Sequence, residues 1–204
     1  MTLVKICGIT RVEDALDAAE LGASAIGLVF WPASPRAIDP ASARAIVEAL
    51  PPLVTPVGVF VDQPEADVER IAAEVRLGAV QLHGRETPAY CGRIRRPVIK
   101  SFGVDGSFDE TALDPYPAGV TVLLDAKDDE RRGGTGRRID WTAAARIAAR
   151  RRIVLAGGVD AGNVEEAIRT VHPFAIDVSS GVERAPGLKD RARMEALFEA
   201  VRRC

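Results

Sequence analysis

Short apolar segments recur along the chain, and segments with helical periodicity separate most of them. Eight of these segments are almost entirely apolar, as expected of parallel strands that are covered on both faces. They are Leu3–Ile6, Ala25–Phe30, Pro56–Val61, Ala79–Leu82, Pro97–Ser101, Val120–Leu124, Ile153–Ala156 and Phe174–Val178. Apolar residues spaced at helical intervals predict helices over Arg11–Leu21, Pro40–Leu50, Pro64–Val75, Asp140–Arg151, Asp160–Val171 and Leu188–Arg202. The segments Arg85–Arg95 and Gly106–Tyr116 are weaker helix predictions, and Pro115 and Pro117 make the second irregular.

Eight β/α units in one chain predict an α/β protein with a single (β/α)8 TIM barrel that spans residues 1–204. The competing architecture is a doubly wound open sheet. Such a sheet usually carries a glycine-rich turn after its first strand, whereas Cys7-Gly8-Ile9-Thr10 is not a G-x-G-x-x-G turn. Eight units also exceed what the smaller open sheets use, so the pattern favours the barrel.

The composition is that of an ordinary globular protein, with 47% hydrophobic and 27% charged residues. Lys and Arg number 27 against 29 Asp and Glu, and this balance argues against nucleic acid or an anionic membrane as the main partner. The three cysteines show no paired spacing, so neither a disulfide framework nor a zinc motif is expected. With no signal-peptide pattern and no long apolar span, we expect a reducing, cytoplasmic setting.

Polar side chains gather where the predicted strands end, which is where barrels of this kind carry their active sites. Because side chains alternate along a strand, Lys5 and Cys7 share one face, as do Gln81 and His83 on another strand. A nearby cation favours thiolate over thiol, so Lys5 is expected to lower the pKa of Cys7 and make it a base or nucleophile. The alternative is that Cys7 is simply a small buried apolar residue.

Two glycine-containing segments predict a phosphate site. Gly157-Gly158 follows the seventh strand, and Ser179-Ser180-Gly181 follows the eighth. Barrels often bind phosphate with these two loops, where glycine lets backbone N–H groups approach the phosphate oxygens. A third segment, Gly133-Gly134-Thr135-Gly136, is either a loop that closes over a ligand or a disordered surface loop.

In order along the chain, these segments resemble the phosphoribosylanthranilate isomerase family of tryptophan biosynthesis. The resemblance rests on motifs spread over nearly the whole sequence. They are Lys5-Ile6-Cys7-Gly8-Ile9-Thr10, Phe30-Trp31-Pro32 with Ser34-Pro35-Arg36, Val57-Gly58-Val59-Phe60, Val80-Gln81-Leu82-His83-Gly84, Leu123-Leu124-Asp125, Gly133-Gly134-Thr135-Gly136 with Asp140-Trp141, Leu155-Ala156-Gly157-Gly158 with Asn163-Val164, Asp177-Val178-Ser179-Ser180-Gly181-Val182-Glu183 and Pro186-Gly187-Leu188-Lys189-Asp190.

The resemblance implies an Amadori rearrangement of N-(5-phosphoribosyl)anthranilate to 1-(2-carboxyphenylamino)-1-deoxyribulose 5-phosphate. By position, Asp125 resembles the general acid and Cys7 the general base. The implied substrate contacts are Arg36 with the anthranilate carboxylate, Asp177 with a sugar hydroxyl, Gly134 and Gly136 in a mobile loop, and Gly157, Gly158, Ser179, Ser180 and Gly181 with the phosphate. His83 is either a further catalytic group or, in preference because Cys7 and Asp125 already fill both roles, a hydrogen-bonding group at the substrate site. The reaction requires neither a metal nor a cofactor, and the family includes monomers and homodimers. The implied partner is thus a small phosphorylated substrate.

Two alternatives remain. One is a dual-substrate isomerase that also accepts the histidine-pathway aminoaldose, although two aspartates would be expected there in place of Cys7 and Asp125. The other is a non-catalytic barrel that only binds phosphate. The presence of both candidate catalytic residues weighs against this second alternative.

Overall fold

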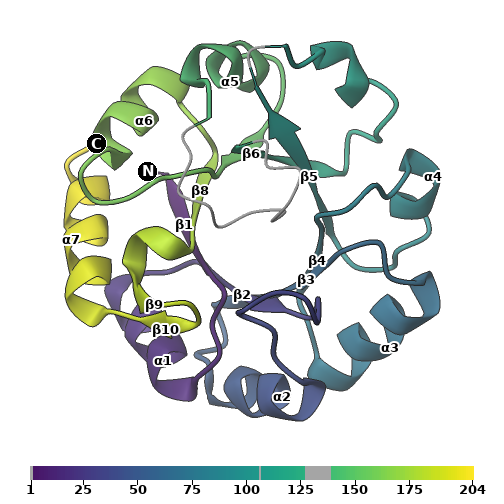
Figure 1. Ribbon diagram of the computed structural model, residues 1–204, viewed down its shortest axis with the longest axis vertical. Helices are drawn as coiled ribbons and strands as arrows, with labels where there is room; N and C mark the ends of the chain where they lie inside the picture. The colour runs from purple at the N-terminus through teal and green to yellow at the C-terminus, as the bar shows by residue number, and fades with distance from the viewer. Residues whose placement is uncertain (1, 106, 127–138) are drawn as a thin grey trace.

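The computed structural model describes residues 2–105, 107–126 and 139–204. Eight parallel strands, each paired with its neighbours in the chain, close into a barrel (Figure 1). They are β1 (Leu3–Cys7), β2 (Ala25–Val29), β3 (Thr55–Phe60), β4 (Ala79–Leu82), β5 (Val98–Val104), β6 (Thr121–Ala126), β7 (Ile153–Leu155) and β8 (Ala175–Val178). The (β/α)8 barrel expected from the apolar pattern is therefore confirmed.

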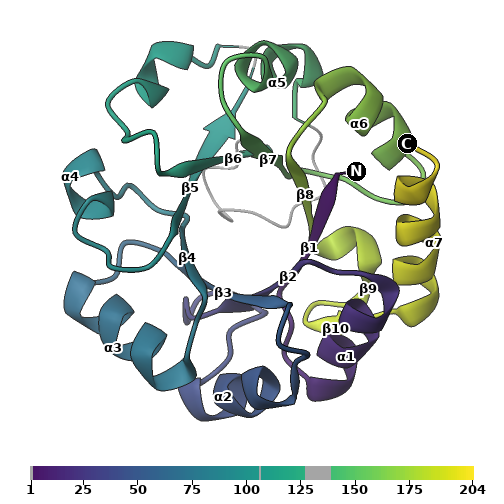
Figure 2. The ribbon, with the colours of Figure 1, turned by 180° about the vertical axis from the view of Figure 1, so that it is seen from behind.

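Helices form a ring outside the barrel, as the two opposite views show (Figures 1 and 2). They are α1 (Val12–Leu21), α2 (Pro40–Ala49), α3 (Glu65–Val75), α4 (Pro88–Cys91), α5 (Trp141–Ala148), α6 (Val164–Val171) and α7 (Arg191–Arg202), with the 3-10 turns η1 (Glu110–Leu113) and η2 (Ser180–Val182). Capping residues determine where several of these helices begin or end. The Asp39 side chain caps α2 by accepting from the Ser42 N–H, while Gly22 ends α1 in the left-handed region at φ 112°.

The structure corrects four of the expected helices, one of them being the helix expected from Asp160, which begins at Val164 as α6. The weak predictions shrink to the single turn α4 and to η1. The last helix begins at Arg191 instead of Leu188, because Leu188–Lys189 form strand β10, which pairs antiparallel with β9 (Glu183–Ala185). Gly187 makes the connecting turn possible at φ 79°, a conformation that costs little without a Cβ. The polar β9–β10 hairpin carries no apolar strand pattern, which is why the sequence did not predict it.

The apolar residues form one shell outside the barrel and two small clusters inside it. The shell lies between the strands and the helices and contains most of the buried side chains. One interior cluster comprises Leu123, Val154, Ala156 and Ala175, and the other comprises Cys7, Val29 and Val59 with Trp31 packed against them. Cys7 thus lies in the barrel interior.

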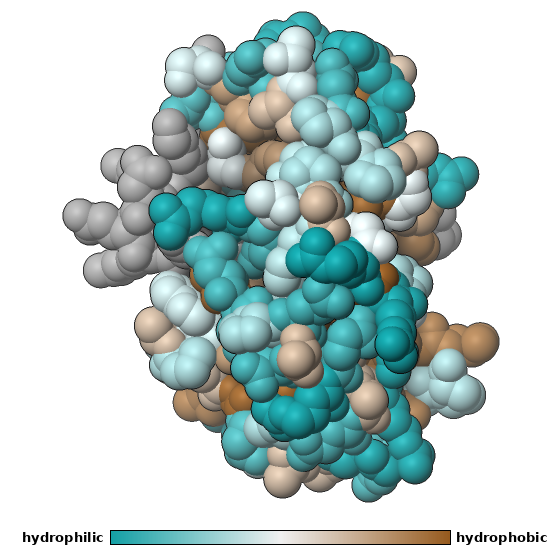
Figure 3. Space-filling model, turned by 90° about the vertical axis from the view of Figure 1, so that its right-hand side faces the viewer, coloured by the Kyte–Doolittle hydropathy of each residue, from teal (hydrophilic) through white to brown (hydrophobic). Residues whose placement is uncertain are grey.

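The face of the molecule seen in Figure 3 is mostly polar. Figure 3 shows a largely hydrophilic face with small, separate hydrophobic areas. The exposed large apolar side chains are Leu3, Leu16, Leu53 and Phe174. Within the described ranges, the structure contains no helix with the length and apolar character of a membrane span.

Candidate active site

Cys7 lies at the end of β1 in a buried polar group with Lys5 and Asp177. Strand pairing places Lys5 opposite Asp177 on β8, and the Lys5 Nζ donates to Asp177 Oδ1 at 2.8 Å. Lys5 is 4% exposed and Cys7 is 8% exposed. Gly27 lies opposite Cys7 on β2, and a Cβ there would be 2.6 Å from Cys7 Sγ and 3.0 Å from Lys5 Nζ. The missing side chain of Gly27 therefore makes room for the thiol and the ammonium.

The pKa of the Cys7 thiol lies above its usual value. Burial raises the pKa of the Cys7 thiol, and the adjacent Lys5 ammonium lowers it only in part. The Asp177 carboxylate also raises it, because it is a second negative charge and already binds Lys5. Cys7 is therefore expected to rest as a thiol. Lys5 does lower the pKa of Cys7, as the shared face suggested, but burial and the Asp177 carboxylate, which the sequence pattern does not reveal, raise it more.

Asp125 lies near the end of β6 and is held by two groups. Its Oδ1 accepts from the Ala126 N–H at 2.8 Å, and its Oδ2 is 3.5 Å from His83 Nε2. On the other side of the imidazole, Gln81 Nε2 is 3.1 Å from His83 Nδ1. If the Gln81 amide donates to Nδ1, the neutral ring carries its hydrogen on Nε2, facing Asp125. The shared face of Gln81 and His83 is thus confirmed, and His83 contacts a candidate catalytic residue.

Arg36 follows β2 and extends across the loop after β1. Its Cδ lies over Gly8, where a Cβ would be only 2.5 Å away. Its guanidinium binds Glu183, from Nε to Oε1 at 2.9 Å and from Nη2 to Oε2 at 2.6 Å. Its side chain is 11% exposed. Arg36 is therefore largely buried and held by a carboxylate of this same chain.

The two predicted phosphate loops lie against each other. Gly157 and Gly158 both have positive φ, 81° and 68°, which an L side chain rarely adopts. A Cβ on Gly181 would clash with the carbonyl oxygen of Val159, so the loop after β8 packs directly on the loop after β7. Ser179 and Ser180 precede this contact, and Ser180 opens η2. The predicted phosphate residues are thus brought together at one side of the barrel mouth.

The predicted loop residues Gly134 and Gly136 lie outside the described residues. Within the described ranges, no cluster of three or more His, Cys, Asp or Glu residues could hold a metal ion.

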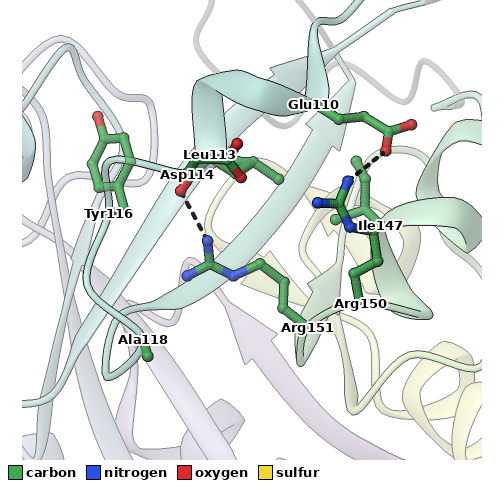
Figure 4. A pocket seen from close by; sticks show the side chains of 8 residues that line it. All are labelled: Glu110, Leu113, Asp114, Tyr116, Ala118, Ile147, Arg150 and Arg151. Atoms are coloured by element: carbon green, nitrogen blue, oxygen red, sulfur yellow. Dashed lines mark hydrogen bonds and ion pairs between the residues drawn. The ribbon is translucent and has the colours of Figure 1, made fainter.

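A separate hollow lies on the outside of the barrel, between η1 and α5 (Figure 4). Its arginines already bind protein groups. Arg151 Nη1 donates to the Leu113 carbonyl at 2.9 Å, and Arg150 Nη1 is 3.9 Å from Glu110 Oε2. None of the predicted site residues lines this hollow.

Sequence reasoning missed Gly27, Glu183 and Lys189. Lys189 is fully buried, and its Nζ donates to Glu183 Oε1 and to the carbonyl oxygens of Cys7 and Ser179. Glu183 and Lys189 flank the Pro186-Gly187 turn within motifs already singled out. Opposite charges on both sides of a tight turn were a usable signal for a hairpin.

The comparisons with known proteins agree over the full length. The family model described as "N-(5'phosphoribosyl)anthranilate (PRA) isomerase" matches residues 4–200. An N-(5'-phosphoribosyl)anthranilate isomerase of Geobacter sp. (strain M21) is 52% identical over 203 residues, covering 100% of this chain and 99% of the relative. The crystal structure of the phosphoribosyl anthranilate isomerase from Thermotoga maritima superposes with a TM-score of 0.93 at 44% identity, covering 100% of both chains.

A further crystal structure of such an isomerase, in complex with reduced 1-(o-carboxyphenylamino)-1-deoxyribulose 5-phosphate, superposes with a TM-score of 0.89 at 42% identity and covers 100% of both chains. The barrel, the polar residues at its strand ends and these matches lead to one conclusion. The chain belongs to the N-(5'-phosphoribosyl)anthranilate isomerase family.

Proposed function

We propose that the chain converts N-(5'-phosphoribosyl)anthranilate into 1-(2-carboxyphenylamino)-1-deoxyribulose 5-phosphate by an Amadori rearrangement, with Asp125 as general acid and Cys7 as general base. The observation that carries the proposal is the placement of these two side chains at the ends of β6 and β1 in a barrel of this family. A cytoplasmic location is part of the same proposal and agrees with the three cysteines being free thiols.

The acid acts first. Protonation of the ribose ring oxygen by Asp125 breaks the bond between C1 and that oxygen and leaves a cationic iminium at C1. His83 Nε2 lies 3.5 Å from Asp125 Oδ2 and is the neighbour best placed to stabilise the carboxylate that remains. A positioned acid of this kind contributes about 10²–10⁴-fold to the rate.

The base acts second. Cys7 first releases its thiol proton to solvent, and the resulting thiolate takes the proton from C2. The C2–H electron pair forms the C1–C2 double bond, and the iminium nitrogen is neutralised. Tautomerisation of the resulting enol moves a proton to C1 and leaves the ketone at C2, so atoms and electrons balance without a redox partner. Burial keeps the Cys7 pKa above its usual value. The cationic iminium beside the sulfur both stabilises the thiolate and acidifies the C2 proton, so proton transfer from C2 to sulfur becomes favourable at that moment.

The substrate's other groups are assigned to the remaining polar residues. Arg36 binds the anthranilate carboxylate, and Asp177 accepts from a sugar hydroxyl. Backbone N–H groups around Gly157, Gly158 and Ser179-Ser180-Gly181 bind the phosphate, supported by the contact between their two loops.

The test is a fluorescence assay that follows the loss of N-(5'-phosphoribosyl)anthranilate. Asp125→Asn and Cys7→Ala should each lower kcat by about 10³-fold, the middle of the range for a general acid or base, while circular dichroism shows an intact fold. Cys204→Ala is the matched control, because Cys204 is exposed at the chain end and should leave kcat unchanged. Near-normal kcat in either site variant would remove that residue from its role. The same assay with the histidine-pathway aminoaldose tests for a dual-substrate enzyme.

A further inference from the structure

Glu183, which has no role in the proposed chemistry, is the centre of a buried ionic cluster. The cluster consists of Arg36, Glu183 and Lys189, and we call it the Glu183 cluster. Glu183 Oε1 accepts from Arg36 Nε at 2.9 Å, from Lys189 Nζ at 2.7 Å and from the Gly187 N–H at 3.2 Å. Glu183 Oε2 accepts from Arg36 Nη2 at 2.6 Å. One carboxylate therefore binds two cations and one backbone amide.

The charges of the cluster do not cancel. Burial alone would raise the pKa of Glu183, but its bonds to Arg36 and its attraction to Lys189 hold that pKa below the usual value. Glu183 is therefore ionised at neutral pH, and its one negative charge is shared between two basic side chains, of which Lys189 has its pKa lowered by burial. The cluster is suited to accept a second carboxylate, and Arg36 is its more exposed cation, with 11% of its side chain accessible against 0% for Lys189.

The pairing geometry decides which edge of Arg36 remains available. Glu183 occupies the edge formed by Nε and Nη2 in a fork, which is the more specific way for arginine to bind a carboxylate. Within the described part of the chain, Nη1 has no hydrogen-bond partner. Gly8 lets the Arg36 side chain lie flat across the first loop, since a Cβ would be 2.5 Å from Arg36 Cδ. The side chain is thus fixed along its length and at its head.

Lys189 links the same cluster to the candidate base. Its Nζ donates to the Cys7 carbonyl oxygen as well as to Glu183. The β9–β10 hairpin, which carries Glu183 and Lys189 on its two strands, therefore contacts both the end of β1 and the loop after β2. In Figures 1 and 2 the hairpin lies beside α1, next to β1.

We propose that Glu183 is a positioning residue that presents the Nη1 edge of Arg36 to the ring carboxylate of the substrate, and so determines the preference for carboxylated arylamine substrates. The proposal rests on the proposed function, in which Arg36 binds the anthranilate carboxylate. An unpaired arginine has many rotamers and loses them when it binds. Because Glu183 already holds Arg36 in one conformation, less conformational entropy is lost when the substrate binds. Replacing Glu183 should therefore raise KM more than it lowers kcat.

The test compares two substrates that differ only in the carboxylate. They are N-(5'-phosphoribosyl)anthranilate and its carboxylate-free analogue made from aniline and ribose 5-phosphate. The measured quantity is the ratio of their kcat/KM values. In the wild type, the carboxylated substrate should be preferred. Glu183→Gln should lower this ratio about tenfold, which corresponds to about 1.4 kcal/mol, through a higher KM for the carboxylated substrate alone.

Glu86→Gln is the matched control. Glu86 is also a buried carboxylate, and its Oε2 lies 3.2 Å from Nζ of the buried Lys100. Both variants should lower Tm, but Glu86→Gln should leave the substrate ratio unchanged. If Glu183→Gln does not fold, Glu183→Asp replaces it, because the shorter side chain keeps the charge but cannot form the same fork.

The outcomes separate the two proposals. A wild-type protein inactive on N-(5'-phosphoribosyl)anthranilate would contradict the proposed function itself. Equal use of both substrates by an active wild type would contradict a carboxylate site at Arg36, and the proposal with it. A Glu183 variant with a lower Tm but an unchanged ratio would show that Glu183 is only structural.

Discussion

The two sides of the barrel mouth are held in different ways. Around Cys7, buried charged groups contact one another in several directions, since Lys5 binds Asp177 while Lys189 binds the Cys7 carbonyl and Glu183. Around Asp125, the contacts made by the described residues are a hydrogen bond from the Ala126 N–H and the approach of His83. A change on the Cys7 side should therefore alter several groups at once, whereas a change on the Asp125 side should remain local.

The largest expected effect is that of Lys5→Met. It removes the cation that lowers the Cys7 pKa and leaves Asp177 unpaired, and both changes raise that pKa further. The pH midpoint of Cys7 alkylation by iodoacetamide, located by peptide mass spectrometry, should move upward. Loss of the base function should lower kcat/KM at neutral pH by about 10³-fold. Breaking a buried pair by removing one partner should also destabilise the fold by about 3–5 kcal/mol.

Lys100→Met separates the loss of stability from the loss of proton transfer. Lys100 is buried and binds Glu86 and the backbone carbonyl groups of Leu82 on β4 and Ser101 on β5. The Lys100→Met variant should lower Tm about as much as Lys5→Met does, without moving the pH midpoint of Cys7 alkylation. If the two lysine variants gave the same alkylation profile, the coupling between Lys5 and Cys7 would be refuted.

A smaller effect is expected from Gly27→Ala. The new methyl group would lie 2.6 Å from Cys7 Sγ, so the thiol must move. Overpacking should destabilise the protein by about 1–3 kcal/mol, and a displacement of about 1 Å should lower kcat about 100-fold. Gly119→Ala is the control, because a Cβ there meets nothing within 4 Å. Urea unfolding and kcat measured together check both effects, and an unchanged kcat would mean that the Cys7 position tolerates the shift.

The smallest effect is expected on the Asp125 side. His83→Gln removes the 3.5 Å contact with Asp125 Oδ2 but leaves the Ala126 N–H bond in place. Loss of this contact, taken to be worth as much as one hydrogen bond, about 1 kcal/mol, should lower kcat about fivefold. A loss above 100-fold would instead make His83 a proton-transfer group and would remove the contrast between the two sides.

The apolar pattern was sufficient to predict the barrel because every strand is buried on both faces. The pattern also showed which polar residues lie at the strand ends. Gln81 and His83, for example, share a face because side chains alternate along a strand, and that alternation depends only on neighbouring residues. It could not predict the Lys5–Asp177 ion pair, because the register between β1 and β8 depends on closure of the whole sheet. The direction of the Cys7 pKa was missed for the same reason, since it depends on burial that neighbouring residues do not reveal.

The Glu183 cluster was missed for a different reason. Arg36 and Glu183 are separated by 147 positions, and no periodicity connects a loop after β2 with a short hairpin after β8. Each residue alone resembles an ordinary surface charge. Only the folded chain shows that both are buried and bind one another.

The pairing of β1 with β8 also has a consequence for folding. Lys5 and Asp177 are 172 positions apart and meet only where the first and last strands close the ring. The sulfur environment of Cys7 therefore cannot exist in a partly folded chain whose ends have not joined, however complete its other strands are. During refolding, the reactivity of this one thiol would report ring closure directly, and the return of secondary structure should precede it because contacts distant in sequence form slowly.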